Sequence, residues 1–210
     1  MNESRVVETF DIEIPRDRTY RLLGMHRKKR EPMESVLCNF DREYAAARGL
    51  VEARAVSIAS RSGIRGSGFF DARAPITLVV CTIGGALEER VAELTGEGRV
   101  ARAMLLDAIG SAAVEAVADR SNLRICEEAL RAGLDPGPRV SPGYGAWKLE
   151  DQAWLFRQLA PKEIGVTLND SGMMTPRKSI SYAVPLTGGA ARPRGRCVHC
   201  GLEDCAYRAE

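Results

Sequence analysis

The sequence predicts an α+β fold in which a mostly antiparallel mixed sheet packs against long helices. Some segments alternate apolar and polar residues, which is typical of strands, and others repeat apolar residues every three or four positions, as helices do. The two kinds of segment are interspersed without the regular strand–helix–strand rhythm of a parallel sheet. Only "ITLVVCTIG", residues 76–84, is apolar throughout, as a strand buried on both faces would be.

Length and composition are those of an ordinary globular protein. The 210 residues are 45% hydrophobic and 28% charged, which is enough to bury a sizeable core. The net charge of +2 gives no strong attraction to nucleic acid or to a membrane surface. The opening residues lack the apolar region of a signal peptide, and no apolar run approaches the roughly 20 residues of a membrane helix, so we expect a cytoplasmic protein.

The first quarter of the chain predicts strand, helix, helix and strand. Residues 7–14 alternate through three apolar positions and indicate a strand. Residues 15–24 indicate a short helix, because a proline stands at the start and a glycine at the end. Residues 33–48 carry apolar side chains on one helical face, and residues 51–60 alternate as a second strand.

The middle of the chain predicts the central strand and two helices. The strand 76–84 is followed by a helix over 86–94 and by the longest helix, over about 99–120. The long helix is rich in alanine, which lets a neighbouring backbone come close. Gly110 in its middle costs about 1 kcal/mol relative to alanine, so we expect close packing at that point.

The last elements are a helix and two strands. Residues 149–159 indicate a helix that Pro161 ends. Residues 164–168 and 179–184 indicate two late strands. We therefore expect one α+β domain over 1–187, including the N-terminal strand and helix region 1–60. A flexible basic linker and a cysteine-rich tail follow over 188–210.

The stretch "RVSPGYGAW", residues 139–147, combines turn-forming residues with an arginine and a tyrosine that a turn does not require. The Arg139 guanidinium is a planar fork that fits a carboxylate, and Tyr144 offers a ring face and a hydroxyl. Glycines such as Gly143 let a ligand reach the backbone. The loop fits an amino acid or a nucleoside derivative with a carboxylate. Alternatively, Arg139 pairs with a buried acid and only holds the loop.

This stretch resembles the Arg-x-x-Pro-Gly-Tyr loop of the activation domain of cobalamin-dependent methionine synthase. A second stretch, "MMTPRKSIS" at 173–181, is similar to a segment of that domain with a methionine, a proline two positions on and then Ser-x-Ser. "VEAVADR" is similar to part of the long helix of the family, where Glu115 takes the place of an acidic residue that lines the cofactor site. The resemblance covers about residues 16–186 and implies the fold of that activation domain.

The resemblance implies a binding site for S-adenosylmethionine. Arg139 would pair with the carboxylate of the methionyl group, and Tyr144 would lie beside the sulfonium. Glu115 would attract the ammonium or the sulfonium charge. The remaining cofactor-binding residues that we expect are Val140, Gly143 and Ser179. For Ser179 the alternative is a hydroxyl at a strand edge, with no ligand.

The implied function is the rescue of an oxidised cobalamin. One electron is added to the corrinoid while a methyl group moves to it from S-adenosylmethionine, and the irreversible transfer drives the reduction. Because this sequence contains no corrinoid-binding or substrate domain, we expect it to act on a partner methyltransferase, or on a methionine synthase without its own activation domain. A protein electron donor is a further possible partner. An ordinary doubly wound methyltransferase is disfavoured, since the glycine-rich turn after the first strand is missing.

A cluster of cysteines near the end of the sequence predicts a metal or iron–sulfur site. "CVHCGLEDC" holds Cys197, Cys200 and Cys205 in a C-x2-C-x4-C pattern, whose first pair can grip one metal ion. The fourth ligand could be His199, a distant cysteine or a residue of a partner, and an unligated thiol tail is the alternative. The second candidate function is therefore a metal or iron–sulfur accessory protein of a corrinoid methyltransferase system, without S-adenosylmethionine. We expect the single cysteines to be small buried hydrophobes: Cys38, Cys81 and Cys126.

Overall fold

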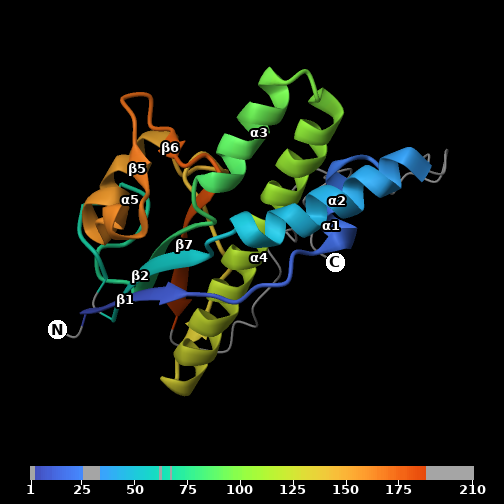
Figure 1. The fold of residues 1–210 in the computed structure, drawn as a ribbon. Helices are drawn as coiled ribbons and strands as arrows, with labels where there is room; N and C mark the ends of the chain where they lie inside the picture. Colours follow the sequence, from blue (N-terminus) through green and yellow to red (C-terminus); the bar gives the residue numbers. More distant parts are fainter. Residues whose placement is uncertain (1–2, 26–33, 62, 67, 188–210) are drawn as a thin grey trace.

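The computed structural model describes residues 3–25, 34–61, 63–66 and 68–187. Its centre is a five-stranded sheet (Figure 1). Every neighbouring pair of strands in this sheet is antiparallel. The order across the sheet is β1 (Glu3–Thr9), β2 (Arg54–Ser60), β3 (Ile76–Thr82), β7 (Ser179–Thr187) and β4 (Asp135–Pro136). The antiparallel sheet and the helices packed on it confirm the predicted α+β class.

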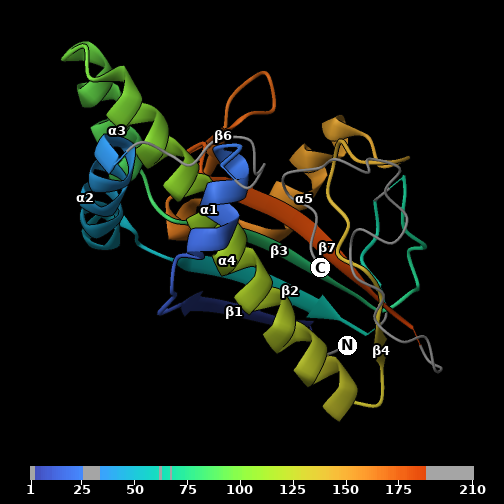
Figure 2. The same cartoon turned by 90° about the vertical axis from the view of Figure 1, so that its right-hand side faces the viewer.

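Each face of the sheet is covered by its own set of elements. On one face, α4 (Val100–Arg131) lies along the strands (Figure 2). Three further helices pack against α4 and complete this layer: α1 (Arg16–Leu22), α2 (Glu34–Leu50) and α3 (Ala86–Gly96). The other face carries α5 (Gln152–Leu159), the 3-10 helix Pro161–Ile164 and a small hairpin of β5 (Thr167–Leu168) and β6 (Met174–Thr175). The sheet is therefore the middle layer between two hydrophobic clusters.

Strand β3 is buried at every position, as its continuous apolar sequence predicts. Val79 and Cys81 belong to the cluster on the α4 face, whereas Leu78 and Val80 belong to the cluster beneath α5. Successive side chains of a strand point to opposite faces, so one apolar run contributes to both clusters. Burial raises the pKa of the Cys81 thiol to about 12, which suits an inert core residue.

Helix α4 is longer than the sequence analysis predicts. It runs 32 residues to Arg131, because Ile125 and Ala129 continue its buried stripe beyond residue 120. Gly110 lies against α3, where a Cβ atom would come within 2.6 Å of Leu87 Cδ2. The glycine in the middle of this helix is thus explained by close packing of α3 on α4.

Several predicted details differ from the structure. Strand β1 lies at Glu3–Thr9 instead of 7–14, because residues up to Thr9 pair with β2 before the chain turns toward α1. The predicted strand 164–168 is reduced to Thr167–Leu168, since the chain before it forms a 3-10 helix that starts at a proline. Cys38 is exposed on α2 and Cys126 is only half-buried on α4, so the expectation that these two cysteines are buried was wrong.

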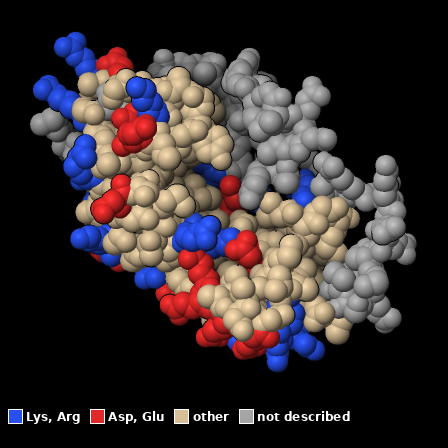
Figure 3. Space-filling model, turned by 90° about the horizontal axis from the view of Figure 1, so that it is seen from above, with Lys and Arg blue, Asp and Glu red and all other residues tan. Residues whose placement is uncertain are grey.

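The surface bears both signs of charge. On the face in Figure 3, lysine and arginine side chains lie interspersed with aspartate and glutamate, in keeping with the net charge of +2. Within the described residues, the helices are too short or too polar to cross a membrane. The two-part organisation, with a domain at 1–187 and a tail at 188–210, stays a prediction because the tail lies outside the described residues.

One ion pair in the helical layer is almost wholly buried. Glu43 of α2 is 1% exposed, and its Oε1 lies 2.5 Å from Nε of Arg102 on α4. A carboxylate at this depth is tolerated only with a partner, because desolvation penalises an isolated charge. The pair ties α2 to α4.

Candidate functional site

The candidate site begins where the chain after β4 runs beside β7. Val140 forms an isolated antiparallel bridge with Ala183: its N–H donates to the Ala183 carbonyl at 2.9 Å, and the Ala183 N–H donates back at 2.8 Å. Val140 packs into the cluster beneath α5. Since neighbouring side chains alternate between the faces, Arg139 extends toward α4. The bridge of Val140 thus fixes where Arg139 enters the site.

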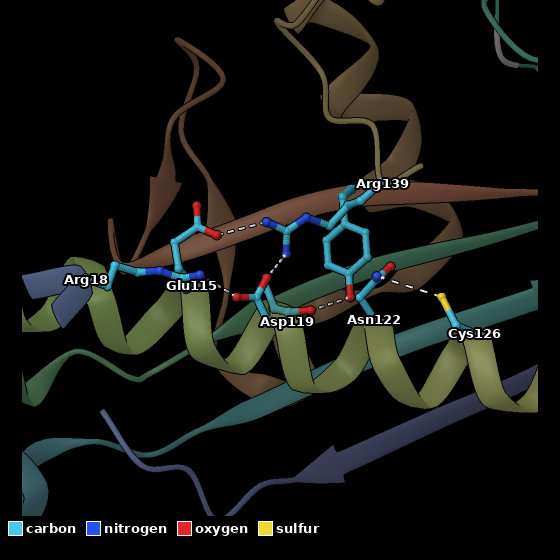
Figure 4. Close-up of polar contacts among 8 residues, drawn as sticks. Arg18, Glu115, Asp119, Asn122, Cys126 and Arg139 are labelled. Carbon is cyan, nitrogen blue, oxygen red and sulfur yellow. Dashed lines mark hydrogen bonds and ion pairs between the residues drawn. The ribbon is translucent and has the colours of Figure 1, made fainter. Parts of the chain in front are cut away.

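Arg139 lies over two acids of α4. Its Nη2 is 2.8 Å from Glu115 Oε2, and its Nη1 is 3.5 Å from Asp119 Oδ1 (Figure 4). Glu115 and Asp119 share a helix face because they are four residues apart. The side chain of Arg139 is only 8% exposed, and that of Glu115 is 16% exposed. Arg139 and Glu115, which come from separate segments of the sequence, thus form a buried, charge-assisted contact.

A second arginine completes the cluster. Arg18 of α1 places its Nη2 2.8 Å from Asp119 Oδ2. Asp119 therefore lies between two guanidinium groups, and charges of opposite sign alternate from Glu115 through Arg139 and Asp119 to Arg18. The formal charges of these four side chains cancel. We call these four residues the charge cluster.

The environment changes the acidity of two groups in the site. Burial raises the pKa of the Glu115 carboxyl, the charge of Arg139 acts against that rise, and the nearby Asp119 adds to it. Burial also raises the pKa of the Tyr182 phenol well above its usual range. The Tyr182 hydroxyl donates to the Ala118 carbonyl at 3.3 Å, and its ring lies 5.1 Å from Arg139 Cζ. Tyr182 is thus a neutral packing surface under the guanidinium.

The rest of the loop is held by a buried tryptophan. Gly143 has a positive φ of 85°, and its N–H donates to the carbonyl of Trp147 at 2.8 Å. The Trp147 ring is buried, stacks on Phe69 with centroids 5.7 Å apart and meets the edge of Phe70. This anchored turn leaves Tyr144 77% exposed. Tyr144 therefore stands at the surface, on the loop that carries the buried Arg139.

The structure does not bring Ser179 to the charge cluster. Ser179 Oγ lies 3.0 Å from Thr82 Oγ1 and 2.7 Å from the Pro176 carbonyl oxygen. Ser179 lies an odd number of positions before Tyr182 in β7, so its side chain leaves the sheet on the face opposite α4. Ser181, on the same face as Ser179, bonds to Gln152 of α5. The expected role of Ser179 in cofactor binding stays a prediction, and the described contacts of the residue are structural.

Two members of the charge cluster, Asp119 and Arg18, were not predicted from the sequence. Asp119 carries a signal that could have been used, because it stands four residues after Glu115 in a predicted helix. Arg18 carries no such sequence signal, because its contact with Asp119 joins positions 101 residues apart.

The predicted metal-binding cysteines belong to the tail at 188–210. Cys197, Cys200 and Cys205 lie outside the described residues. Within the described part of the chain, no group of three or more histidine, cysteine, aspartate or glutamate side chains could hold a metal ion. The predicted metal or iron–sulfur site therefore stays a prediction.

The fold and the charge cluster define the class: an α+β domain with a buried arginine–carboxylate site between a surface loop and a long helix. This chain has the fold of the structure described as "Crystal Structure of the MetH Reactivation Domain bound to AdoHcy", with a TM-score of 0.59 over 89% of this chain and 80% of that chain. The identity is 15%, so the likeness establishes the fold. It confirms the fold that the sequence resemblance implied. No family model matches the chain, and no curated protein matches its sequence.

Proposed function

We propose that this protein binds S-adenosylmethionine and supports the reductive remethylation of an oxidised corrinoid on a partner methyltransferase. The observation that carries the proposal is the buried Arg139 guanidinium, 2.8 Å from Glu115, in a chain with the fold of a reactivation domain bound to AdoHcy. The loop residues of the sequence resemblance, from Arg139 to Tyr144, supply this arginine. The fold and the site thus support the same function.

The charge cluster suits the amino-acid end of S-adenosylmethionine. That end carries a carboxylate and an ammonium group. A guanidinium binds a carboxylate through two parallel hydrogen bonds, and a carboxylate such as Glu115 binds an ammonium. Both protein groups are mostly buried, so their interactions with a ligand would be screened little by water.

The residues of this chain would bind and orient S-adenosylmethionine, and the reactive groups would come from the ligand, the partner and an electron donor. S-adenosylmethionine, when bound, would supply the methyl group, and a low-potential donor would supply one electron. Arg139 and Glu115 would fix the amino-acid end, while the exposed Tyr144 would lie beside the sulfonium on the side that a partner can reach. On this proposal the protein is the activation component of a methyl transfer whose acceptor is the corrinoid of the partner. The partner is a corrinoid-binding methyltransferase, or a methionine synthase without its own activation domain.

Ligand binding to the wild-type protein tests the proposed site. In calorimetry, we expect S-adenosylhomocysteine (AdoHcy) to bind at least about tenfold more tightly than 5′-methylthioadenosine, which lacks the amino-acid end, because buried charged pairs are worth well over 1.4 kcal/mol. Equal affinities for the two nucleosides would show that the amino-acid end is not recognised. An absence of binding to either, or to S-adenosylmethionine, would contradict the proposed function.

The cysteine tail gives a second, independent prediction. We expect Cys197, Cys200 and Cys205 to bind iron–sulfur or zinc, since three closely spaced thiolates are typical ligands of both. The protein is purified without oxygen, and iron, sulfide and zinc per chain are measured in the wild type and in Cys200→Ser. Cys38→Ser, which changes an exposed cysteine of α2, is the matched control. Zinc alone would mean a structural site and an outside electron source, and a tail without any of the three would be a set of thiols only.

A further inference from the structure

We propose that Asp119 competes with the ligand's carboxylate for Arg139, and that Arg18 weakens this competition by holding Asp119 toward α1. Arg18 and Asp119 would then be positioning residues that set the affinity of the site. This inference rests on the proposed function, in which Arg139 binds the carboxylate of S-adenosylmethionine. Asp119 and Arg18 would determine which side of the Arg139 guanidinium the ligand's carboxylate can reach.

The two acids hold Arg139 unequally. The contact of Nη2 with Glu115, at 2.8 Å, has the length usual for charge-assisted hydrogen bonds. The contact of Nη1 with Asp119, at 3.5 Å, is much longer. Asp119 makes its short contact, at 2.8 Å, with Arg18 instead (Figure 4). The Nη1 side of Arg139 is therefore the loosely held side.

The difference in burial between the two acids also indicates that the ligand's carboxylate binds on the Nη1 side of Arg139. Asp119 is 43% exposed, whereas Glu115 is 16% exposed. Displacing Glu115 from Arg139 would separate a buried carboxylate from its guanidinium, which is costly. Displacing Asp119 would leave it with Arg18 and with water. An incoming carboxylate therefore replaces Asp119 at Nη1 and leaves the contact between Arg139 and Glu115 in place.

This arrangement determines whether each substitution strengthens or weakens ligand binding. The ligand's carboxylate must approach the like charge of Asp119, so removing that charge should strengthen binding. Removing Arg18 leaves Asp119 with Arg139 as its remaining cationic partner in the charge cluster, so binding should weaken. If Asp119 instead attracts the ligand's ammonium, Asp119→Asn will weaken binding, and the two ideas predict opposite results.

The test measures binding of AdoHcy and of 5′-methylthioadenosine by calorimetry in Asp119→Asn, Arg18→Met and the double variant. We expect Asp119→Asn to bind AdoHcy roughly tenfold more tightly and Arg18→Met roughly tenfold more weakly, the size of one charge interaction at partial burial. The double variant should bind more tightly than Arg18→Met alone, which mere loss of the α1 anchor would not produce. Binding of 5′-methylthioadenosine should stay within about twofold, since it has no carboxylate.

Asp41→Asn is the matched control, because Asp41 pairs at 2.8 Å with Arg16, also on α1, outside the charge cluster. It should leave both affinities unchanged. Asp119→Asn is nearly isosteric, so it keeps the test decisive if Arg18→Met does not fold. Unchanged or weaker AdoHcy binding in Asp119→Asn, with a wild type that binds, overturns this inference alone. Loss of AdoHcy binding in both wild type and Asp119→Asn overturns the proposed function and this inference with it.

Discussion

Arg139→Ala is expected to weaken AdoHcy binding by well over tenfold. Truncating one partner of a buried, hydrogen-bonded charge pair costs about 2–5 kcal/mol, and the Arg139 side chain is almost wholly buried. The loss should be confined to ligands with a carboxylate, so the affinity for 5′-methylthioadenosine should change little. Calorimetry with both ligands measures the difference.

Two further variants make this result interpretable. Arg139→Lys keeps the positive charge but lacks the planar fork, so we expect an intermediate affinity. Arg131→Ala removes an exposed arginine at the end of α4 and should have no effect. If a folded Arg139→Ala binds AdoHcy as tightly as the wild type, Arg139 serves only to hold its loop against Glu115 and Asp119. That is the alternative that the sequence leaves open.

Glu43→Ala is expected to lower the free energy of unfolding by about 3–5 kcal/mol. The substitution leaves the Arg102 guanidinium without its buried partner at the contact between α2 and α4, and breaking a buried pair has about this cost. Urea unfolding followed by circular dichroism measures the change. Such a loss is a large fraction of the stability of an ordinary domain.

The control for Glu43 is a pair of the same kind at the surface. Asp41→Ala removes an exposed partner of Arg16 and should cost no more than about 1 kcal/mol. Replacing Glu43 and Arg102 together by leucine should cost less than Glu43→Ala, because no buried charge is then left unpaired. Equal effects of Glu43→Ala and Asp41→Ala would contradict the view that burial makes the first pair important.

The order and type of the main elements could be read from the sequence, because each carries a local signal. The apolar run of β3 predicted a strand buried on both faces, and residues 179–184 indicated the late strand β7. Element ends were less accurate. Helix α4 continues past residue 120 because Ile125 finds a place in the core, which depends on contacts made by distant segments.

The candidate site could be predicted only where residues carry a motif. Arg139 and Glu115 were both named from the sequence, and the structure places them in contact. Arg18 comes from α1 and has no motif, so only the fold reveals its contact with Asp119. The contacts of Ser179 depend on the face of β7 to which its side chain points, and the Ser-x-Ser motif does not predict that face.

Reactivation of a corrinoid partner tests the central claim most directly. The protein is mixed without oxygen with S-adenosylmethionine, a low-potential reductant and a candidate partner holding cob(II)alamin, and the visible spectrum is followed. We expect the methyl-cob(III)alamin bands to appear only when both this protein and S-adenosylmethionine are present, and to be strongly reduced with Arg139→Ala. If no candidate corrinoid partner gains these bands, or if they form equally fast without the protein, the account is contradicted.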